Sequence, residues 1–65
     1  MQEKTKLIID RLKEKYADDA EALETIENAV KDIEYIEGKE VAGGYEGQSS
    51  EGKALELEAF LHDWY

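Results

Sequence analysis

Cysteine and proline are absent from this sequence, histidine occurs once, and charged residues interrupt every apolar stretch. Without cysteine the chain forms neither a disulfide nor a thiolate metal site, and one histidine cannot complete a zinc site. No stretch approaches the roughly 18 apolar residues that a membrane span needs, and the charged N-terminal segment is not typical of a signal peptide. We therefore expect a cytoplasmic protein without metal, cofactor or membrane contact.

Basic residues are also few. The chain has 8 Lys and Arg residues against 17 Asp and Glu residues, which gives a formal net charge of −9. Residues 1–15 carry a net charge of +2, whereas residues 16–65 carry −11. Direct binding to DNA, RNA or an anionic membrane is disfavoured, because attraction to phosphate dominates such affinities. A basic partner protein fits this charge. The alternative is that the charge only keeps a small protein soluble.

The length of the chain allows one small domain, 1–65. A chain of this size buries only about 60% of the surface that its unfolded state exposes. Since disulfides and metals are excluded, its stability has to come from good packing between helices or from self-association. We therefore expect a homodimer to complete the core.

The clearest pattern in the sequence is a helix over residues 18–37. Its apolar stripe recurs at steps of three and four residues, which places the stripe on one face of a helix. The stripe consists of Leu23, Ile26, Val30 and Ile33. Asp18, with Glu21 three positions later, is typical of a capping box at the start of this helix. Gly38 stands where such a helix commonly ends.

Two further helices and a loop are predicted. Residues 5–16 have a helical stripe made of Ile8, Ile9, Leu12 and Tyr16. Residues 50–64 have another, made of Leu57, Phe60, Leu61 and Trp64, and either Ser49 or Ser50 is suited to cap this helix. Residues 38–49 have the composition of a glycine-rich loop. A short β-hairpin around Gly43 and Gly44 is the alternative for this segment.

Residues 5–37 allow two arrangements. The consecutive aspartates Asp18 and Asp19 favour a turn and a cap, which would make a helical hairpin. A heptad register also runs through the segment, so one continuous helix with a coiled-coil seam is the alternative. We favour the hairpin, because the continuous helix would place Asp19 in the seam, where an unpaired carboxylate is costly. The expected fold is all-α, a hairpin plus a third C-terminal helix forming a small three-helix bundle.

No motif indicates an enzyme. Gly47–Lys53 fits the G-x-x-x-x-G-K spacing of a P-loop, but Ala54 stands where that motif needs a Ser or Thr hydroxyl for magnesium, and no apolar strand precedes the loop. Glu58 and His62 lie one helical turn apart, and two such ligands are more typical of a solvated pair than of a metal site. We therefore expect no catalytic residue and no nucleotide site.

Two surfaces are candidates for binding a partner. The first is the acidic side of helix 18–37, with Glu21, Glu24, Glu27, Asp32, Glu34 and Tyr35 as its expected contact residues. The second is formed by Phe60, Leu61 and Trp64, an acidic aromatic helix face suited to a hydrophobic groove. For this second surface we favour packing against helix 18–37, because the chain has few other residues from which to build a core.

These observations lead to two hypotheses of function. The first is a small acidic interaction protein that occupies the basic surface of a nucleic-acid-binding partner and inhibits it, as phage-type inhibitors and nucleic-acid mimics do. The second is a self-assembling adaptor or structural subunit that partners recognise through its apolar helix stripes. Binding through the acidic face would weaken steeply with salt, whereas binding through apolar stripes would respond little.

Overall fold

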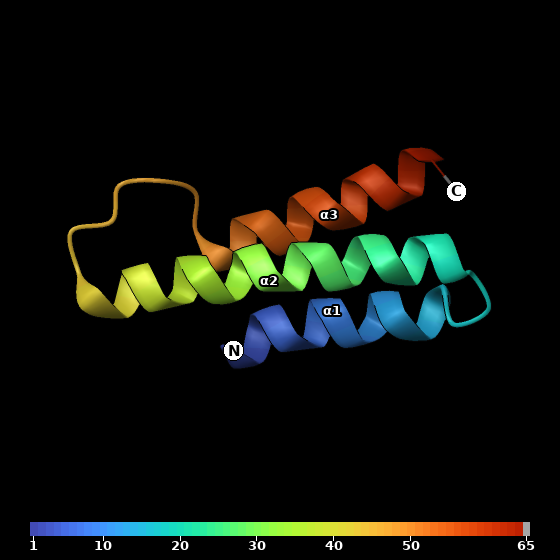
Figure 1. Cartoon of the computed structure of the whole chain (residues 1–65), viewed down its shortest axis with the longest axis horizontal. Coiled ribbons are helices and arrows are strands. Elements are labelled where there is room, and N and C mark those ends of the chain that lie inside the picture. The colour runs from blue at the N-terminus through green and yellow to red at the C-terminus, as the bar shows by residue number, and fades with distance from the viewer. Residues whose placement is uncertain (65) are drawn as a thin grey trace.

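A computed structural model describes residues 1–64 of the chain, and these residues form three α-helices and no β-strand. The helices are α1 (Glu3–Lys15), α2 (Ala20–Ala42) and α3 (Ser50–Trp64). The chain reverses direction between consecutive helices, so α1 and α3 run the same way and α2 runs against both (Figure 1). The prediction of an all-α fold, a helical hairpin followed by a third helix, is confirmed.

The turn between α1 and α2 settles the choice between a hairpin and one long helix. α1 ends at Lys15, and α2 begins at Ala20 with Asp19 as its N-cap. The carboxylate of Asp19 accepts a hydrogen bond of 3.1 Å from the backbone N–H of Ala22. The cap is therefore one residue later than the predicted Asp18. Asp19, the one residue that would have interrupted a continuous seam, lies at the turn, where its carboxylate satisfies a free N–H group.

The end of α2 differs from the prediction. The helix continues through Gly38 to Ala42, and its C-cap is Gly43. Gly43 and Gly44 have φ angles of 87° and 75°, a region that glycine enters without steric cost. The N–H of Gly43 donates to the carbonyl oxygens of Lys39 and Glu40 at 3.1 and 3.3 Å. The expected stop at Gly38 was therefore wrong, because a glycine inside a helix costs only about 1 kcal/mol relative to alanine.

The connection from α2 to α3 is correspondingly short. It comprises residues 43–49, and no strand lies in the described part of the chain, so the alternative of a β-hairpin was wrong. Ser49, one of the two predicted caps, closes the start of α3. Its hydroxyl oxygen accepts a hydrogen bond of 3.0 Å from the backbone N–H of Gly52.

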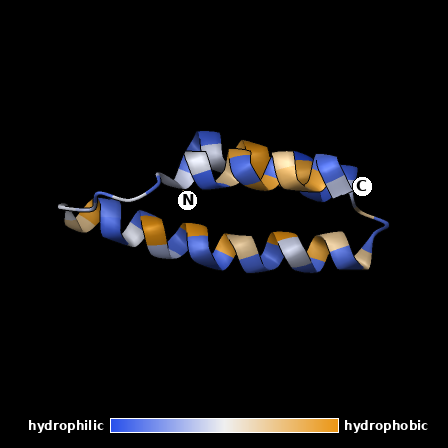
Figure 2. Ribbon diagram, turned by 90° about the horizontal axis from the view of Figure 1, so that it is seen from above, coloured by the Kyte–Doolittle hydropathy of each residue, from blue (hydrophilic) through white to orange (hydrophobic). Residues whose placement is uncertain are grey.

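The core lies where the apolar face of α2 meets α1 and α3. Figure 2 shows these two helices together on one side of α2. The buried apolar residues are Ile9, Leu12 and Tyr16 of the hairpin's first arm, Ala22, Ile26, Ala29, Ile33 and Ile36 of α2, and Ala54, Leu57 and Leu61 of α3. Of the predicted core residues, Leu23 and Val30 are partly buried and pack against the edge of this cluster. A single chain thus buries the central stripe of each helix, and dimerisation stays a prediction.

Two residues expected in the core are at the surface. Phe60 is 46% exposed and Trp64 is 71% exposed. The row of α3 that enters the core consists of Ser50, Ala54, Leu57 and Leu61. Phe60 precedes Leu61 by one residue and so lies on the flank of this row, and Trp64 lies in the last turn of the helix. Packing of this aromatic pair in the core, the arrangement we favoured, was therefore wrong.

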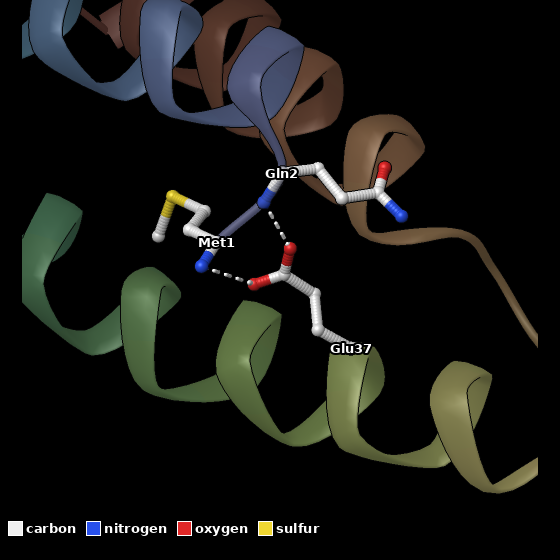
Figure 3. A network of polar contacts seen from close by, with 3 residues as sticks. All are labelled: Met1, Gln2 and Glu37. Atoms are coloured by element: carbon white, nitrogen blue, oxygen red, sulfur yellow. Dashed lines mark hydrogen bonds and ion pairs between the residues drawn. The ribbon is translucent and has the colours of Figure 1, made fainter.

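A carboxylate of α2 holds the start of α1. The backbone N–H of Gln2 donates to Oε2 of Glu37 at 2.6 Å, and the amino group of Met1 lies 3.9 Å from Oε1 of the same side chain (Figure 3). The N-cap residue Gln2 makes no side-chain cap of its own. Glu37 therefore supplies from α2 the acceptor and the negative charge that favour a helix N-terminus. This contact accounts for a start at Glu3, two residues before the predicted one.

Candidate protein-binding surface

The outer side of α2 carries the residues that the sequence pointed to. All six expected contact residues are exposed, and they are Glu21, Glu24, Glu27, Asp32, Glu34 and Tyr35. The helix has seven acidic and two basic side chains over 23 residues. The six residues do not form one uniform strip, however, because α1 and α3 flank α2 on different edges. The edge beside α1, the edge beside α3 and the outward side each have a different electrostatic setting.

The edge beside α1 is partly neutralised within the chain. Nζ of Lys13 lies 3.6 Å from Oε1 of Glu27, and both side chains are largely solvated. Glu34 lines a shallow groove between α1 and α2, together with Lys6 and Lys13. Exposed pairs of this kind contribute little to stability, but they lower the negative potential along this edge. Glu27 and Glu34 are therefore weaker candidates for attracting a basic partner than their sequence positions suggested.

The outward side of α2 carries charges of both signs and one exposed aromatic ring. Glu24, Lys31 and Tyr35 recur here at steps of seven and four residues, which is the spacing of one helix side. Tyr35 is 66% exposed, and Nζ of Lys39 lies 5.5 Å from the centre of its ring. The Tyr35 ring already has a cation of this chain beside it. Glu24 and Lys31 both lack an ion pair within residues 1–64, and Glu24 is the acidic one of the two.

The edge beside α3 joins an acidic residue to an apolar groove. The groove has a volume of about 270 Å³ and is lined by Thr25, Ala29 and Asp32 of α2 and by Lys53, Glu56, Leu57 and Phe60 of α3. The rings of Phe60 and Trp64 pack at a centroid distance of 5.7 Å with an interplanar angle of 35°. Glu21, three helical turns before Asp32, lies on the same side of α2. The two surfaces that the sequence suggested separately therefore meet along this edge.

The carboxylates in this groove differ in their partners. Glu56 accepts a hydrogen bond of 2.8 Å from Nε2 of Gln48 and lies 3.7 Å from Nζ of Lys53. Within the described residues, the carboxylate of Asp32 has neither a hydrogen bond nor an ion pair. The negative charge of Asp32 is thus available to a partner, whereas that of Glu56 is used within the chain.

A third groove, between α1 and α3, was not apparent from the sequence. It has a volume of about 440 Å³, and its lining includes Arg11 and Lys15 of α1 with Leu55, Glu58 and His62 of α3. Glu58 and His62, the pair that the sequence placed one turn apart, therefore face two cationic side chains. Among residues 1–64 no group of three or more His, Cys, Asp or Glu side chains is placed to hold a metal ion. Nothing local in the sequence reveals this groove, because it depends on how α1 and α3 pack.

Neither the hydropathy of the helices nor a similarity to known proteins points to a function. None of the helices in the described range, 1–64, is long and apolar enough to cross a membrane. Comparisons of the chain with protein-family models, with curated proteins and with solved structures find no match. A function has to be inferred from the surfaces of the molecule alone.

Proposed function

We propose that this protein is a binding module that docks on the basic surface of a partner protein. The surface that makes the contact, called here the acidic aromatic surface, consists of Glu21, Glu24, Asp32, Phe60 and Trp64. The observation that carries the proposal is the juxtaposition of exposed carboxylates on α2 with an exposed aromatic pair on α3, 46% and 71% exposed. Large aromatic side chains exposed beside charges are typical of residues that dominate protein–protein binding energy.

The charge and the aromatic pair have different parts in this proposal. A net charge of −9 on a small molecule speeds its encounter with a basic surface, because the attraction acts over several ångströms before contact. Exposed charge pairs add little affinity once contact is made. Burial of Phe60 and Trp64 then supplies most of the binding energy, since a buried aromatic side chain excludes much apolar surface from water.

The partner that we propose is a nucleic-acid-binding protein, which the module inhibits by covering its basic surface. Proteins that bind nucleic acid use basic surfaces to contact its phosphate groups, and such a surface also attracts an acidic protein. α2 has a net charge of −5 over 23 residues, or about one charge per 7 Å of helix. Duplex DNA has about one charge per 1.7 Å. One copy of this helix is therefore a weak electrostatic mimic of a duplex, and competition with nucleic acid depends on the aromatic contacts as well.

The alternative proposal, an adaptor recognised through its apolar stripes, has less support. Ile26, Ile33 and Leu61 lie at the centre of those stripes and are completely buried within the chain. A partner reaches them only by displacing α1 or α3. Apolar recognition is therefore left to exposed side chains such as Phe60 and Trp64, which belong to the surface proposed above.

The test removes three negative charges from the acidic aromatic surface. The variant combines Glu21→Gln, Glu24→Gln and Asp32→Asn, and it is used as bait in an extract of the native host. We expect the variant to retain basic nucleic-acid-binding proteins more weakly than the unchanged protein does, because its encounter with a basic surface is slower. Added nucleic acid should compete for the same proteins, and binding should weaken between about 0.02 and 0.15 M salt, over which screening shortens to about 8 Å.

A matched control removes three charges elsewhere. Glu34→Gln, Glu46→Gln and Glu58→Gln change the net charge by the same amount, and all three residues are exposed. Retention of the same partners by the control confirms that position, and not total charge, decides binding. Equal retention by both variants, or partners that nucleic acid does not displace, would contradict the proposed function.

A further inference from the structure

We infer that the groove between α2 and α3 receives an arginine side chain of the partner protein. This inference rests on the proposed function and names the chemistry that the acidic aromatic surface recognises. Its basis is the combination of a small hollow, an unpaired carboxylate on one wall and an exposed aromatic ring on the other.

The size of the groove suits a single side chain. Its volume of about 270 Å³ lies below the range of about 300–1,000 Å³ that is typical of sites for small molecules. Ala29, which is 8% exposed, lines the α2 wall together with Asp32, and its small side chain fills little of the groove. Leu57 contributes a further apolar contact on the α3 wall. A long side chain with an apolar stem fits these walls.

The groove has one uncompensated negative charge, which a single cation would neutralise. Its lining contains two carboxylates, Asp32 and Glu56, and one ammonium group, that of Lys53. Lys53 is held 3.7 Å from Glu56, so a cation of this chain already compensates that carboxylate. Asp32, on α2, keeps its charge uncompensated within residues 1–64. The groove therefore has an excess of one negative charge, which one cationic side chain of the partner neutralises.

Arginine fits this combination better than lysine does. The planar guanidinium group stacks on aromatic rings and forms two parallel hydrogen bonds with a carboxylate. A lysine ammonium group is a compact point charge that holds its hydration more strongly. A guanidinium group in this groove has Asp32 on one side and the Phe60 ring on the other. Trp64 lies in ring contact with Phe60 and extends the aromatic wall.

The experiment compares an oligoarginine peptide with an oligolysine peptide of equal length. Trp64 is the single tryptophan of the chain, so its fluorescence reports binding beside the groove. We expect the unchanged protein to bind oligoarginine about two- to fivefold more tightly than oligolysine, the ratio that an exposed cation–π contact provides. Phe60→Leu keeps an apolar side chain in the groove and removes the aromatic ring, so it should weaken oligoarginine binding more than oligolysine binding and thereby reduce this preference.

A pair of charge variants locates the site. Asp32→Asn and Glu34→Gln each remove one negative charge from α2, but only Asp32 lines this groove. Asp32→Asn should weaken oligoarginine binding more than Glu34→Gln does, with circular dichroism confirming that both variants are folded. Equal affinity for the two peptides, together with equal effects of the two variants, overturns the inference and leaves the proposed function intact. Failure of both peptides to bind at low salt overturns the inference and the proposed function together.

Discussion

Two hydroxyl groups are buried in the otherwise apolar core. Thr5 and Ser50 are 0% and 1% exposed, and within residues 1–64 the Oγ atom of neither has a hydrogen-bond partner. Both residues lie in the first turn of their helices, and α1 and α3 begin at the same end of the bundle (Figure 1). A buried hydroxyl without a partner loses its hydration without compensation. The two hydroxyls therefore lower the stability that apolar packing gives to this end of the core.

Replacing one of these hydroxyls should stabilise the protein. Thr5→Val keeps the shape of the side chain and removes the polar atom, so we expect the free energy of unfolding to rise by about 1 kcal/mol. Thermal unfolding followed by circular dichroism should show a midpoint about 4–8 °C higher. Thr25→Val is the control, because Oγ1 of Thr25 donates to the carbonyl oxygen of Glu21 at 3.0 Å. The control should show no such gain, because its substitution removes a hydrogen bond. No gain in Thr5→Val either would show that the Thr5 hydroxyl has a partner in solution.

Substitutions at the centre of the core should instead lower the free energy of unfolding. Ile26 and Ile33 are completely buried and are among the largest side chains in the core. Truncation of either to alanine leaves a cavity and should cost about 2–5 kcal/mol. A domain with about 5 kcal/mol of total stability then loses most of its helix signal in circular dichroism. An unchanged signal and melting midpoint would contradict the assignment of these residues to the core.

At the scale of the helices, the local sequence pattern predicted which segments are helical better than it predicted where each helix begins and ends. The steps of three and four residues along the stripe of Leu23, Ile26, Val30 and Ile33 were sufficient to predict α2. Its C-terminus was not predictable from Gly38 alone, because an exposed glycine lowers helix stability without ending a helix. The start of α1 depends on Glu37, which is 35 residues away from Gln2 in the sequence. Contacts over such distances do not appear in a local pattern.

The glycines of α2 give a prediction at this scale. Gly38 lies inside the helix, is exposed, and has open space around the position of a β-carbon. Gly38→Ala should therefore stabilise the protein by about 0.5–1 kcal/mol. Gly43→Ala is the matched substitution, and it should destabilise the protein, because its φ of 87° is strained for any residue with a side chain. Chemical denaturation of both variants measures these changes, and a loss on Gly38→Ala would contradict a helix that continues through residue 38.

The candidate site was predictable only in part, because it also depends on contacts between residues that are distant in the sequence. Charge and periodicity were sufficient to place Glu21, Glu24 and Asp32 on the surface of a helix. They did not reveal that α3 packs with Phe60 beside Asp32, because that depends on the register between α2 and α3. Nor did they reveal that α1 places Lys13 beside Glu27. The acidic side of one helix is thus divided into edges of different character by its two neighbours.

At the scale of the whole molecule, oligomeric state is a further prediction. We expect a homodimer at micromolar concentration, because a core of this size seldom supplies more than about 3–5 kcal/mol. Since the central stripes are buried within one chain, the contacts would have to come from exposed apolar residues such as Leu7, Leu55 and Val41. Sedimentation equilibrium over a hundredfold concentration range decides the question. A 7.4 kDa species throughout, with a melting temperature independent of concentration, would mean that the monomer is stable alone.

Charge is distributed unevenly over the three helices. α1 has five basic and three acidic side chains, whereas α2 and α3 are both net acidic. α1 lies against both of the other helices and so reduces the repulsion between them. The chain as a whole still has a net charge of −9, and the fold extends over only 38 × 19 × 16 Å along its three principal axes. At 0.01 M salt the screening length of about 30 Å is close to the 38 Å length of the molecule, so repulsion acts across the whole fold.

Salt should therefore act in opposite directions on the free protein and on its complex. Raising salt from about 0.01 to 0.15 M shortens the screening length to about 8 Å and weakens the internal repulsion, so the melting temperature of the free protein should rise modestly. The same change weakens attraction to a basic partner, and affinity should fall roughly tenfold. Scanning calorimetry and titration of the isolated partner, carried out over one salt series, measure both effects. If affinity and melting temperature rose together, apolar contacts would dominate the complex, and the charge of α2 would serve only to keep the protein in solution.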